Sequence, residues 1–259
     1  MLLREIINSI ESVAPRSAQE NWDNSGMQVG DTGRDIQSVL LTTDVTPEVV
    51  DEAIMLGCQL IISHHPLLFH GLKQVCGQTP QACMVAKAIK HDIAIYSAHT
   101  SLDSVPGGIN TRLADMLGIR DYRILVPNGQ NPNTGLGVIG QLEKTMTYVD
   151  FLAHVRETLH TTYIRYTRAA HEQIQCVALC GGAGVEFMDA AIEQGAQLYL
   201  TADCKYHDFQ AAEGRINLVD IDHWVSENHA RTIFRDILSD IDVKCYISEA
   251  DNTPISVKC

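Results

Sequence analysis

The chain has 259 residues, of which 45% are hydrophobic and 20% are charged, and its formal net charge is −13. This composition is typical of a globular protein with one large or two smaller domains, and no apolar run reaches the roughly 18 residues of a membrane-spanning helix. The acidic balance disfavours broad binding to nucleic-acid backbones. The amphipathic start of the chain lacks the features of a signal peptide, so we expect a cytoplasmic protein.

In chain order, alternating helix and strand patterns predict an α/β fold with mostly parallel sheets flanked by helices. The Pro-, Asn- and Gly-rich segment 126–135 is predicted to be an inter-domain linker. The strand pattern at 243–248 is expected to return to the first half of the chain. Apolar spacing and cap residues predict helices over 2–13, 47–56, 80–90, 107–117, 147–159, 185–194 and 225–239.

An internal repeat organises the chain. Residues 39–66 and 177–204 align without gaps, and each copy reads as strand, turn, helix, glycine stop and strand. We infer two similar α/β domains from an internal duplication, with chance similarity of two βαβ units as the alternative. The predicted domains are residues 1–126 plus 230–259 and residues 127–229, with a metal site at their interface.

The eight cysteines show no CxxC spacing, and several lie within apolar patterns. This distribution favours free, buried thiols over a cysteine zinc site or a disulfide framework. No GxSxG motif is present, so a Ser/His/Asp triad is not supported.

Three clusters of metal-ligand residue types each follow a predicted strand. Neutral imidazole and carboxylate ligands suit zinc, manganese, iron or nickel, so converging strand ends predict a two-metal site. In the third cluster a spacing of four residues at a helix start places both side chains on one face; a dipole-favoured glutamate beside a structural histidine is the alternative. The clusters contain His64 and His65, His99 and Asp103, and His223 and Glu227.

Further residues are weaker candidates. His99 fits a metal ligand, an orienting residue, a general base or a structural residue. The turn with Gly181, Gly182 and Gly184 is a candidate phosphate-binding turn, and a tight turn without a ligand explains it equally well. The polar stretch 203–208, including His207, either lines the pocket or forms a solvated face. The polar loop 21–26 is a candidate cover for the site.

Several motifs together resemble the Nif-three-like family, whose members are commonly labelled GTP cyclohydrolase 1 type 2. They are WDNSGMQVGD, IISHHPLLFHG, YSAHTSLD, the GGAG turn and DHWVSE. The resemblance extends over about residues 1 to 250 and indicates the compact bacterial form. It implies a two-domain α/β subunit with a dinuclear metal centre and a ring-shaped homohexamer built as a trimer of dimers.

The resemblance also implies ligands and an activity. The ligands would be His64, His65, Asp103, His223 and Glu227, with Glu227 bridging two divalent ions (Zn, Mn, Fe or Ni). The expected activity is metal-dependent hydrolysis of a nucleotide-like substrate by a metal-activated hydroxide, with His99 as a candidate proton shuttle. The alternatives are a non-enzymatic metal-handling or regulatory protein and a ring-shaped nucleic-acid processing or repair factor. One departure from the family pattern is Asp222, which adds a carboxylate close to the expected site.

Overall fold

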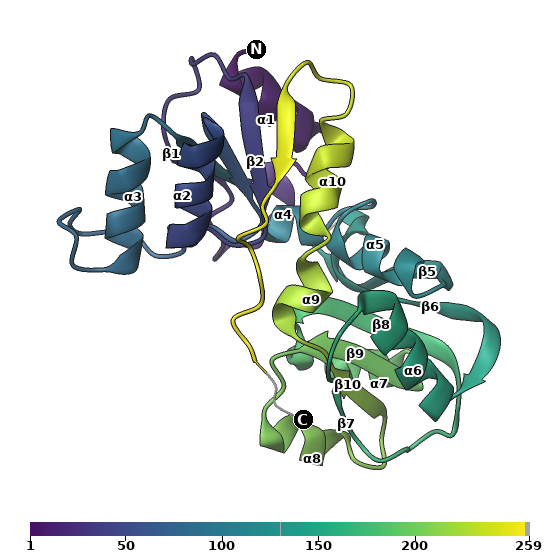
Figure 1. The fold of residues 1–259 in the computed structure, drawn as a ribbon. Helices are drawn as coiled ribbons and strands as arrows, with labels where there is room; N and C mark the ends of the chain where they lie inside the picture. The colour runs from purple at the N-terminus through teal and green to yellow at the C-terminus, as the bar shows by residue number, and fades with distance from the viewer. Residues whose placement is uncertain (130, 257–259) are drawn as a thin grey trace. The chain divides into compact units, whose positions relative to one another are not determined.

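The computed structural model describes residues 1–129 and 131–256 and divides the chain into two compact units. The first unit comprises Met1–Leu102 with Asn228–Asn252, and the second comprises Asp103–Glu227 with Thr253–Cys259. Both units are α/β with helices flanking a sheet (Figure 1), as the sequence predicts. Along the described chain, no helix combines the length and the apolar character needed to cross a bilayer.

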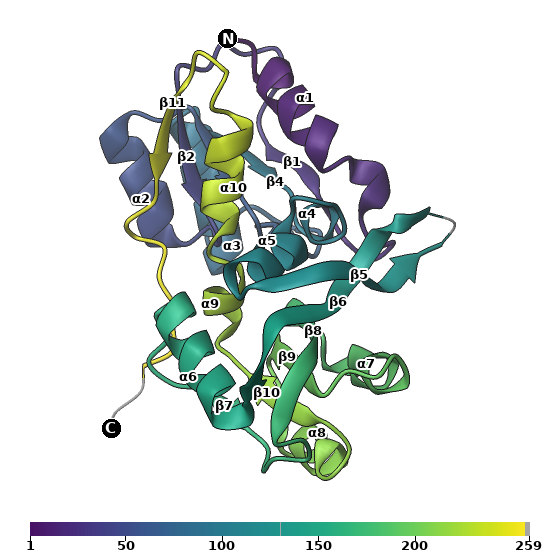
Figure 2. The ribbon, with the colours of Figure 1, turned by 90° about the vertical axis from the view of Figure 1, so that its right-hand side faces the viewer.

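The first unit has a sheet in the order β1-β4-β3-β2-β11. All its neighbouring strands are parallel except β1, which pairs antiparallel with β4. Helices α1 and α10 cover one face and α2 and α3 the other (Figures 1 and 2). The elements are α1 Leu3–Val13, η1 Arg16–Ala18, β1 Gly26–Val29, β2 Ser38–Thr42, α2 Pro47–Leu56, β3 Leu60–Ser63, α3 Pro80–Lys90, β4 Ala94–Ser97, α10 Ala230–Ile237 and β11 Lys244–Ile247.

Local sequence explains these elements. Thr46 accepts a hydrogen bond from the Val49 amide at the start of α2, and Gly57 ends the helix with a left-handed backbone. Thr79 caps α3 in the same way. Every residue of β2, β3 and β4 is buried, because helices cover both faces of the sheet.

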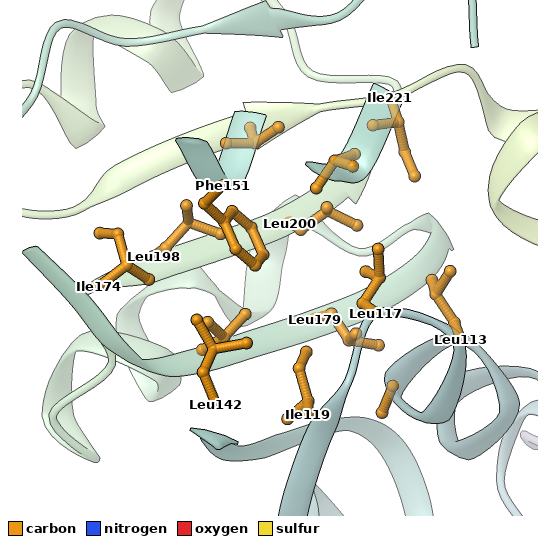
Figure 3. Packing of buried hydrophobic residues seen from close by; sticks show 14 of the residues in the cluster. Leu113, Leu117, Ile119, Leu142, Phe151, Ile174, Leu179, Leu198, Leu200 and Ile221 are labelled. Atoms are coloured by element: carbon orange, nitrogen blue, oxygen red, sulfur yellow. The ribbon is translucent and has the colours of Figure 1, made fainter. Parts of the chain in front are cut away.

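The second unit has a sheet in the order β5-β6-β8-β9-β10-β7. Its core lies between the sheet and α5 and α6, where Phe151 of α6 points toward Leu198 and Leu200 of β9 (Figure 3). Helices α7 and α8 pack on the other face. The elements are α5 Ile109–Met116, β5 Ile119–Asn128, β6 Asn131–Thr147, α6 Tyr148–Leu159, β7 Arg165–Tyr166, β8 Gln173–Ala183, η2 Val185–Phe187, α7 Met188–Glu193, β9 Leu198–Ala202, α8 Tyr206–Ala212, β10 Asn217–Asp220 and α9 His223–Glu227; the short α4, Thr100–Asp103, contains the boundary between the units.

The linker prediction for 126–135 is wrong. Its described residues lie in the β5 and β6 hairpin, where Val126 pairs with Leu136 and Pro127 with Gly135. A Cβ on Gly135 would lie 2.2 Å from the Val126 carbonyl oxygen, so glycine permits a close approach of the strands. The N-terminal segment of the first unit therefore ends at Leu102 rather than at residue 126, because α5 and β5 pack with the second sheet, and its C-terminal segment is Asn228–Asn252 rather than 230–259.

Other differences are local. The second sheet is mixed rather than mostly parallel: β8-β9 and β9-β10 are parallel, whereas β5-β6, β6-β8 and β10-β7 are antiparallel. The helix predicted over 225–239 is two helices, α9 and α10, which the unit boundary at Asn228 separates. The strand over 243–248 does return to the first unit, as β11 beside β2. The cysteines that the structure describes are free thiols, as expected.

Candidate metal centre

His64 and His65 continue directly from β3. Their backbone amides donate to the carbonyl oxygens of Thr42 (3.2 Å) and Thr43 (2.9 Å), which holds the chain against β2 beyond the end of the strand. His64 is fully buried, and the His65 side chain is 22% exposed. The ring centroids lie only 4.9 Å apart, so the strand end turns the two neighbouring rings toward each other.

His99 joins these two histidines from the end of β4. Its ring centroid is 5.4 Å from those of both His64 and His65. One ring nitrogen from each residue can be chosen so that all three lie within 4.8 Å of one another, a spacing compatible with one metal ion. The first unit therefore brings together three imidazoles, including the one to which the sequence assigned several roles.

Hydrogen bonds determine which nitrogen of each ring is available to a metal or a proton. The Nδ1 atoms of His64, His65 and His99 lie 2.9 Å from Ala98 O, 2.8 Å from Asp44 Oδ1 and 2.8 Å from Asp23 Oδ1. A carbonyl or carboxylate oxygen only accepts, so we assign the hydrogen of each neutral ring to Nδ1. The lone pair then lies on Nε2 in all three rings, which is the arrangement common among metal-binding histidines.

Asp23, which sequence reasoning did not single out, anchors His99. Its side chain is fully buried and accepts hydrogen bonds from Ser25 Oγ (2.8 Å), Thr100 Oγ1 (2.6 Å) and the Thr100 amide (3.1 Å) besides His99. Burial favours a higher pKa for Asp23, but the hydrogen bonds from His99, Thr100 and Ser25 lower the pKa well below its usual range. The loop 21–26 thus supplies a buried carboxylate to this histidine.

The second unit positions His223 between two carboxylates. Its Nδ1 is 2.7 Å from Asp203 Oδ2, and its Nε2 is 2.9 Å from Glu227 Oε2, one turn further along α9. Burial favours a lower pKa for His223, but the hydrogen bonds to Asp203 and Glu227 raise the pKa to about 11. Without a metal this imidazole is therefore protonated at neutral pH. The two carboxylates stabilise a positive charge between them, which either the imidazolium or a metal ion can supply.

The glycine turn after β8 packs against Glu227. A Cβ on Gly182, whose φ is +62°, would lie 2.1 Å from Glu227 Oε1 and 3.2 Å from His223 Nε2. The amides of this turn have side-chain acceptors, which favours the alternative of a tight turn over a phosphate-binding turn. The amides of Gly181, Gly182 and Gly184 donate to Asn110 Oδ1 (2.8 Å), Ser226 Oγ (2.8 Å) and Thr201 Oγ1 (3.1 Å).

Asp103 is buried at the end of α4. Its carbonyl oxygen accepts a hydrogen bond from Asn110 Nδ2 at 3.0 Å, while Asn110 Oδ1 accepts the Gly181 amide. The buried Asn110 side chain thereby joins the Asp103 turn to the glycine turn that contacts Glu227. Sequence reasoning missed this residue, because an asparagine in an amphipathic helix carries no distinguishing pattern.

Asp222 and the stretch 203–208 have structural roles. Asp222 Oδ1 accepts the Val225 amide at 3.1 Å in the first turn of α9, and Oδ2 accepts Thr253 Oγ1 at 2.9 Å. In 203–208, Asp203 contacts His223, whereas His207 is exposed and its Nδ1 is 3.3 Å from Gln210 Oε1 on α8. The stretch therefore contributes one residue to the site and otherwise begins a helix.

Comparison with known proteins agrees with the resemblance. The family model for Duf34/NIF3 (NGG1p interacting factor 3) matches residues 1–254. The chain belongs to the DUF34/NIF3 family. This NIF3-family chain is 37% identical over 230 residues to a Clostridium perfringens protein named GTP cyclohydrolase 1 type 2 homolog, covering 88% of the chain and 87% of that relative. A Clostridium acetobutylicum protein of the same name is 33% identical over 229 residues, with 87% and 85% covered.

Solved structures support the same fold for this NIF3 protein. A Bacillus cereus protein related to NIF3 superposes with a TM-score of 0.91 at 25% identity, covering 100% of this chain and 99% of the other. The family and the two-sheet α/β architecture predicted from the motifs are thus confirmed.

Proposed function

We propose that the protein binds two divalent metal ions, zinc, manganese, iron or nickel, and is a hydrolase of the GTP cyclohydrolase 1 type 2 kind acting on a nucleotide-like substrate. The observation that carries this proposal is the hydrogen bonding of the three proposed histidine ligands: a carbonyl or carboxylate oxygen holds the Nδ1 of His64, His65 and His223, which leaves Nε2 for a metal. The proposed ligands are His64, His65, Asp103, His223 and Glu227.

The residues fit such ions by their chemistry. His64 and Asp103 are buried, and Glu227 is buried beside His223. Buried polar groups are shielded from water, so binding a metal ion would compensate for their lost hydration. The protein offers imidazole and carboxylate ligands without a thiolate, which suits borderline divalent metals. When bound, such ions act as Lewis acids and lower the pKa of water.

Two further polar residues, His99 and Asp23, would take part in proton transfer. With Asp23 holding its Nδ1–H, His99 can accept and release a proton only at Nε2, as the proton-shuttle assignment requires. The grouping of His99 with His64 and His65 equally suits a third imidazole ligand. Metal analysis of His99→Asn distinguishes the two: unchanged metal content with lost turnover supports the shuttle, and reduced metal content supports the ligand.

The alternative functions predict different measurements. A metal-handling or regulatory protein with the same ligands would exchange its metal readily and would hydrolyse no nucleotide. A nucleic-acid processing factor would bind DNA or RNA at low salt, which the net charge of −13 disfavours. Conversion of a panel of purine nucleotides by the purified protein, compared with Glu227→Gln, tests the hydrolase directly.

The assembly and location expected from the sequence also belong to the proposal. A ring-shaped hexamer, a trimer of dimers, predicts a particle of about six subunits in light scattering after size-exclusion chromatography. A monomer at micromolar concentration would contradict it. The proposed location is the cytoplasm, where the free thiols of the described cysteines would remain reduced.

A further inference from the structure

A cavity of about 710 Å³ lies within the second unit, between α6 and the segment 162–169. Tyr148, Leu152 and Arg156 line it from successive turns of α6, and Ile164 and Tyr166 line it from the facing segment. None of these residues belongs to the proposed metal centre. The volume falls in the range of small-molecule sites, which is roughly 300–1,000 Å³.

The walls of this cavity are held in place by the core. Tyr148 and Leu152 are buried members of the hydrophobic cluster, and Ile164 packs against the same cluster. The Tyr148 hydroxyl donates to the Thr167 carbonyl at 3.1 Å, which ties the segment to α6. The rings of Tyr148 and Tyr166 lie 6.1 Å apart at an angle of 88°. The aromatic walls are therefore formed before a ligand arrives.

The rim leaves apolar surface uncovered. Val149 is 72% exposed and Tyr166 is 55% exposed beside the buried floor. Exposed aromatic and aliphatic side chains around a hollow are typical of a surface that binds an apolar ligand. Two tyrosine rings set nearly at right angles favour a flat ring, which can stack on one and meet the edge of the other.

Charges at the rim restrict the ligand further. Arg168 forms an ion pair with Glu213 at 2.6 Å, whereas Arg156 makes no ion pair with any residue that the structure describes. Arg156 is exposed in the last turn of α6, where its guanidinium can bind a carboxylate. Glu172 also lines the cavity and would repel a ligand of higher negative charge.

We propose that this cavity is an accessory binding site for a planar aromatic monoanion, such as an aryl carboxylate, separate from the metal centre. The aromatic walls would hold the ring, and Arg156 would bind the anionic group. The proposal does not depend on hydrolase activity.

Calorimetric titration of the full-length protein with 2-naphthoate and with neutral 2-naphthamide tests the proposal. We expect saturable binding of naphthoate, and Arg156→Gln should weaken it by about tenfold or more, to the level of the amide. Arg235→Gln is the matched control, because Arg235 is likewise exposed in the last turn of a helix; its affinity should stay within about twofold of the wild type.

Two further variants separate the cavity from other sites. Ala153→Trp, at an exposed position of α6 lining the cavity, should fill it and abolish binding of both compounds. Glu227→Gln should bind naphthoate as the wild type does, because the naphthoate carboxylate is expected to bind Arg156 rather than a metal held by Glu227. The proposal is overturned by an absence of saturable binding, by unchanged affinity in Arg156→Gln or Ala153→Trp, or by loss of binding in Glu227→Gln. Thermal unfolding of each variant confirms that it is folded.

Discussion

Gly182 and Glu227 are in such close contact that a Cβ on Gly182 would lie 2.1 Å from Glu227 Oε1. The glycine turn therefore fixes the position of a proposed metal ligand. A methyl group at this position must displace the Glu227 carboxylate, since the opposing atoms are well inside van der Waals contact.

Gly182→Ala should thus lower the metal content. The added cost of alanine in a left-handed backbone is roughly 1–2 kcal/mol of stability. Gly214→Ala is the matched control, because Gly214 has a φ of +75° and nothing within 4 Å of a built Cβ. Metal analysis and urea unfolding should show reduced stability in both variants and reduced metal content only in Gly182→Ala. Equal metal content in the two variants would contradict the role of the contact.

Asp203→Asn should weaken metal binding by about 10- to 100-fold, as is typical for a carboxylate that orients a metal-binding histidine. Asparagine tolerates the left-handed backbone of Asp203, whose φ is 56°, so the change removes charge without adding strain. A competition titration with a chromophoric chelator measures the affinity. Asp240→Asn, at an exposed position, is the control, and an unchanged affinity for Asp203→Asn would remove the residue from the site.

Metal binding should release protons, and its affinity should increase with pH. The pKa of His223 is raised to about 11 in the metal-free protein, so the ring carries a proton that a metal must displace. Below that pKa, the apparent affinity at this histidine should increase by about tenfold per pH unit for each proton displaced. Calorimetry in buffers of different ionisation enthalpy measures the proton release; an affinity independent of pH between 6 and 8 would exclude His223 as a ligand.

Asp23→Asn should destabilise the first unit. The variant replaces a buried carboxylate that accepts hydrogen bonds from Ser25, Thr100 and His99, each charge-assisted bond contributing about 1.5–3 kcal/mol. Because the pKa of Asp23 is lowered by folding, its stabilising contribution is present above the unfolded pKa of about 4 and declines as the pH falls below that value. Urea unfolding at pH 7 should show the loss, with Asp240→Asn as the control; equal stability of Asp23→Asn and wild type at pH 7 would contradict it.

The sequence points to the proposed ligands more readily than to the residues that hydrogen-bond to them. His64, His65 and His223 are recognisable because each follows a buried strand, and Glu227 because four residues separate it from His223 on one helix. The aspartates that hold the histidines cannot be recognised in this way, because each contacts a histidine 20 to 76 residues away. The pairs are Asp44 with His65, Asp23 with His99, and Asp203 with His223. The local sequence around an aspartate does not indicate which histidine its side chain will contact in the folded protein.

Two glycine-rich segments show where the sequence leaves alternatives open. A Gly- and Pro-rich segment is compatible with either a linker or a bulged hairpin. The structure shows the hairpin, in which β5 and β6 approach closely at Gly135. A glycine turn before a helix fits a phosphate site or a tight contact, and the Ser226 and Thr201 side chains favour the tight contact by accepting hydrogen bonds from the amides of Gly182 and Gly184. Neither the strand pairing nor the side-chain acceptors can be read from the local composition of these segments.

Glu227 is proposed to be a ligand of a two-metal centre. Elemental analysis of the purified protein should find about two divalent ions per chain, and Glu227→Gln should lose at least one of them together with any nucleotide turnover. Glu157→Gln, which changes an exposed glutamate of α6, should keep both. Equal metal content in the wild type and Glu227→Gln, or no metal in either, would contradict the account.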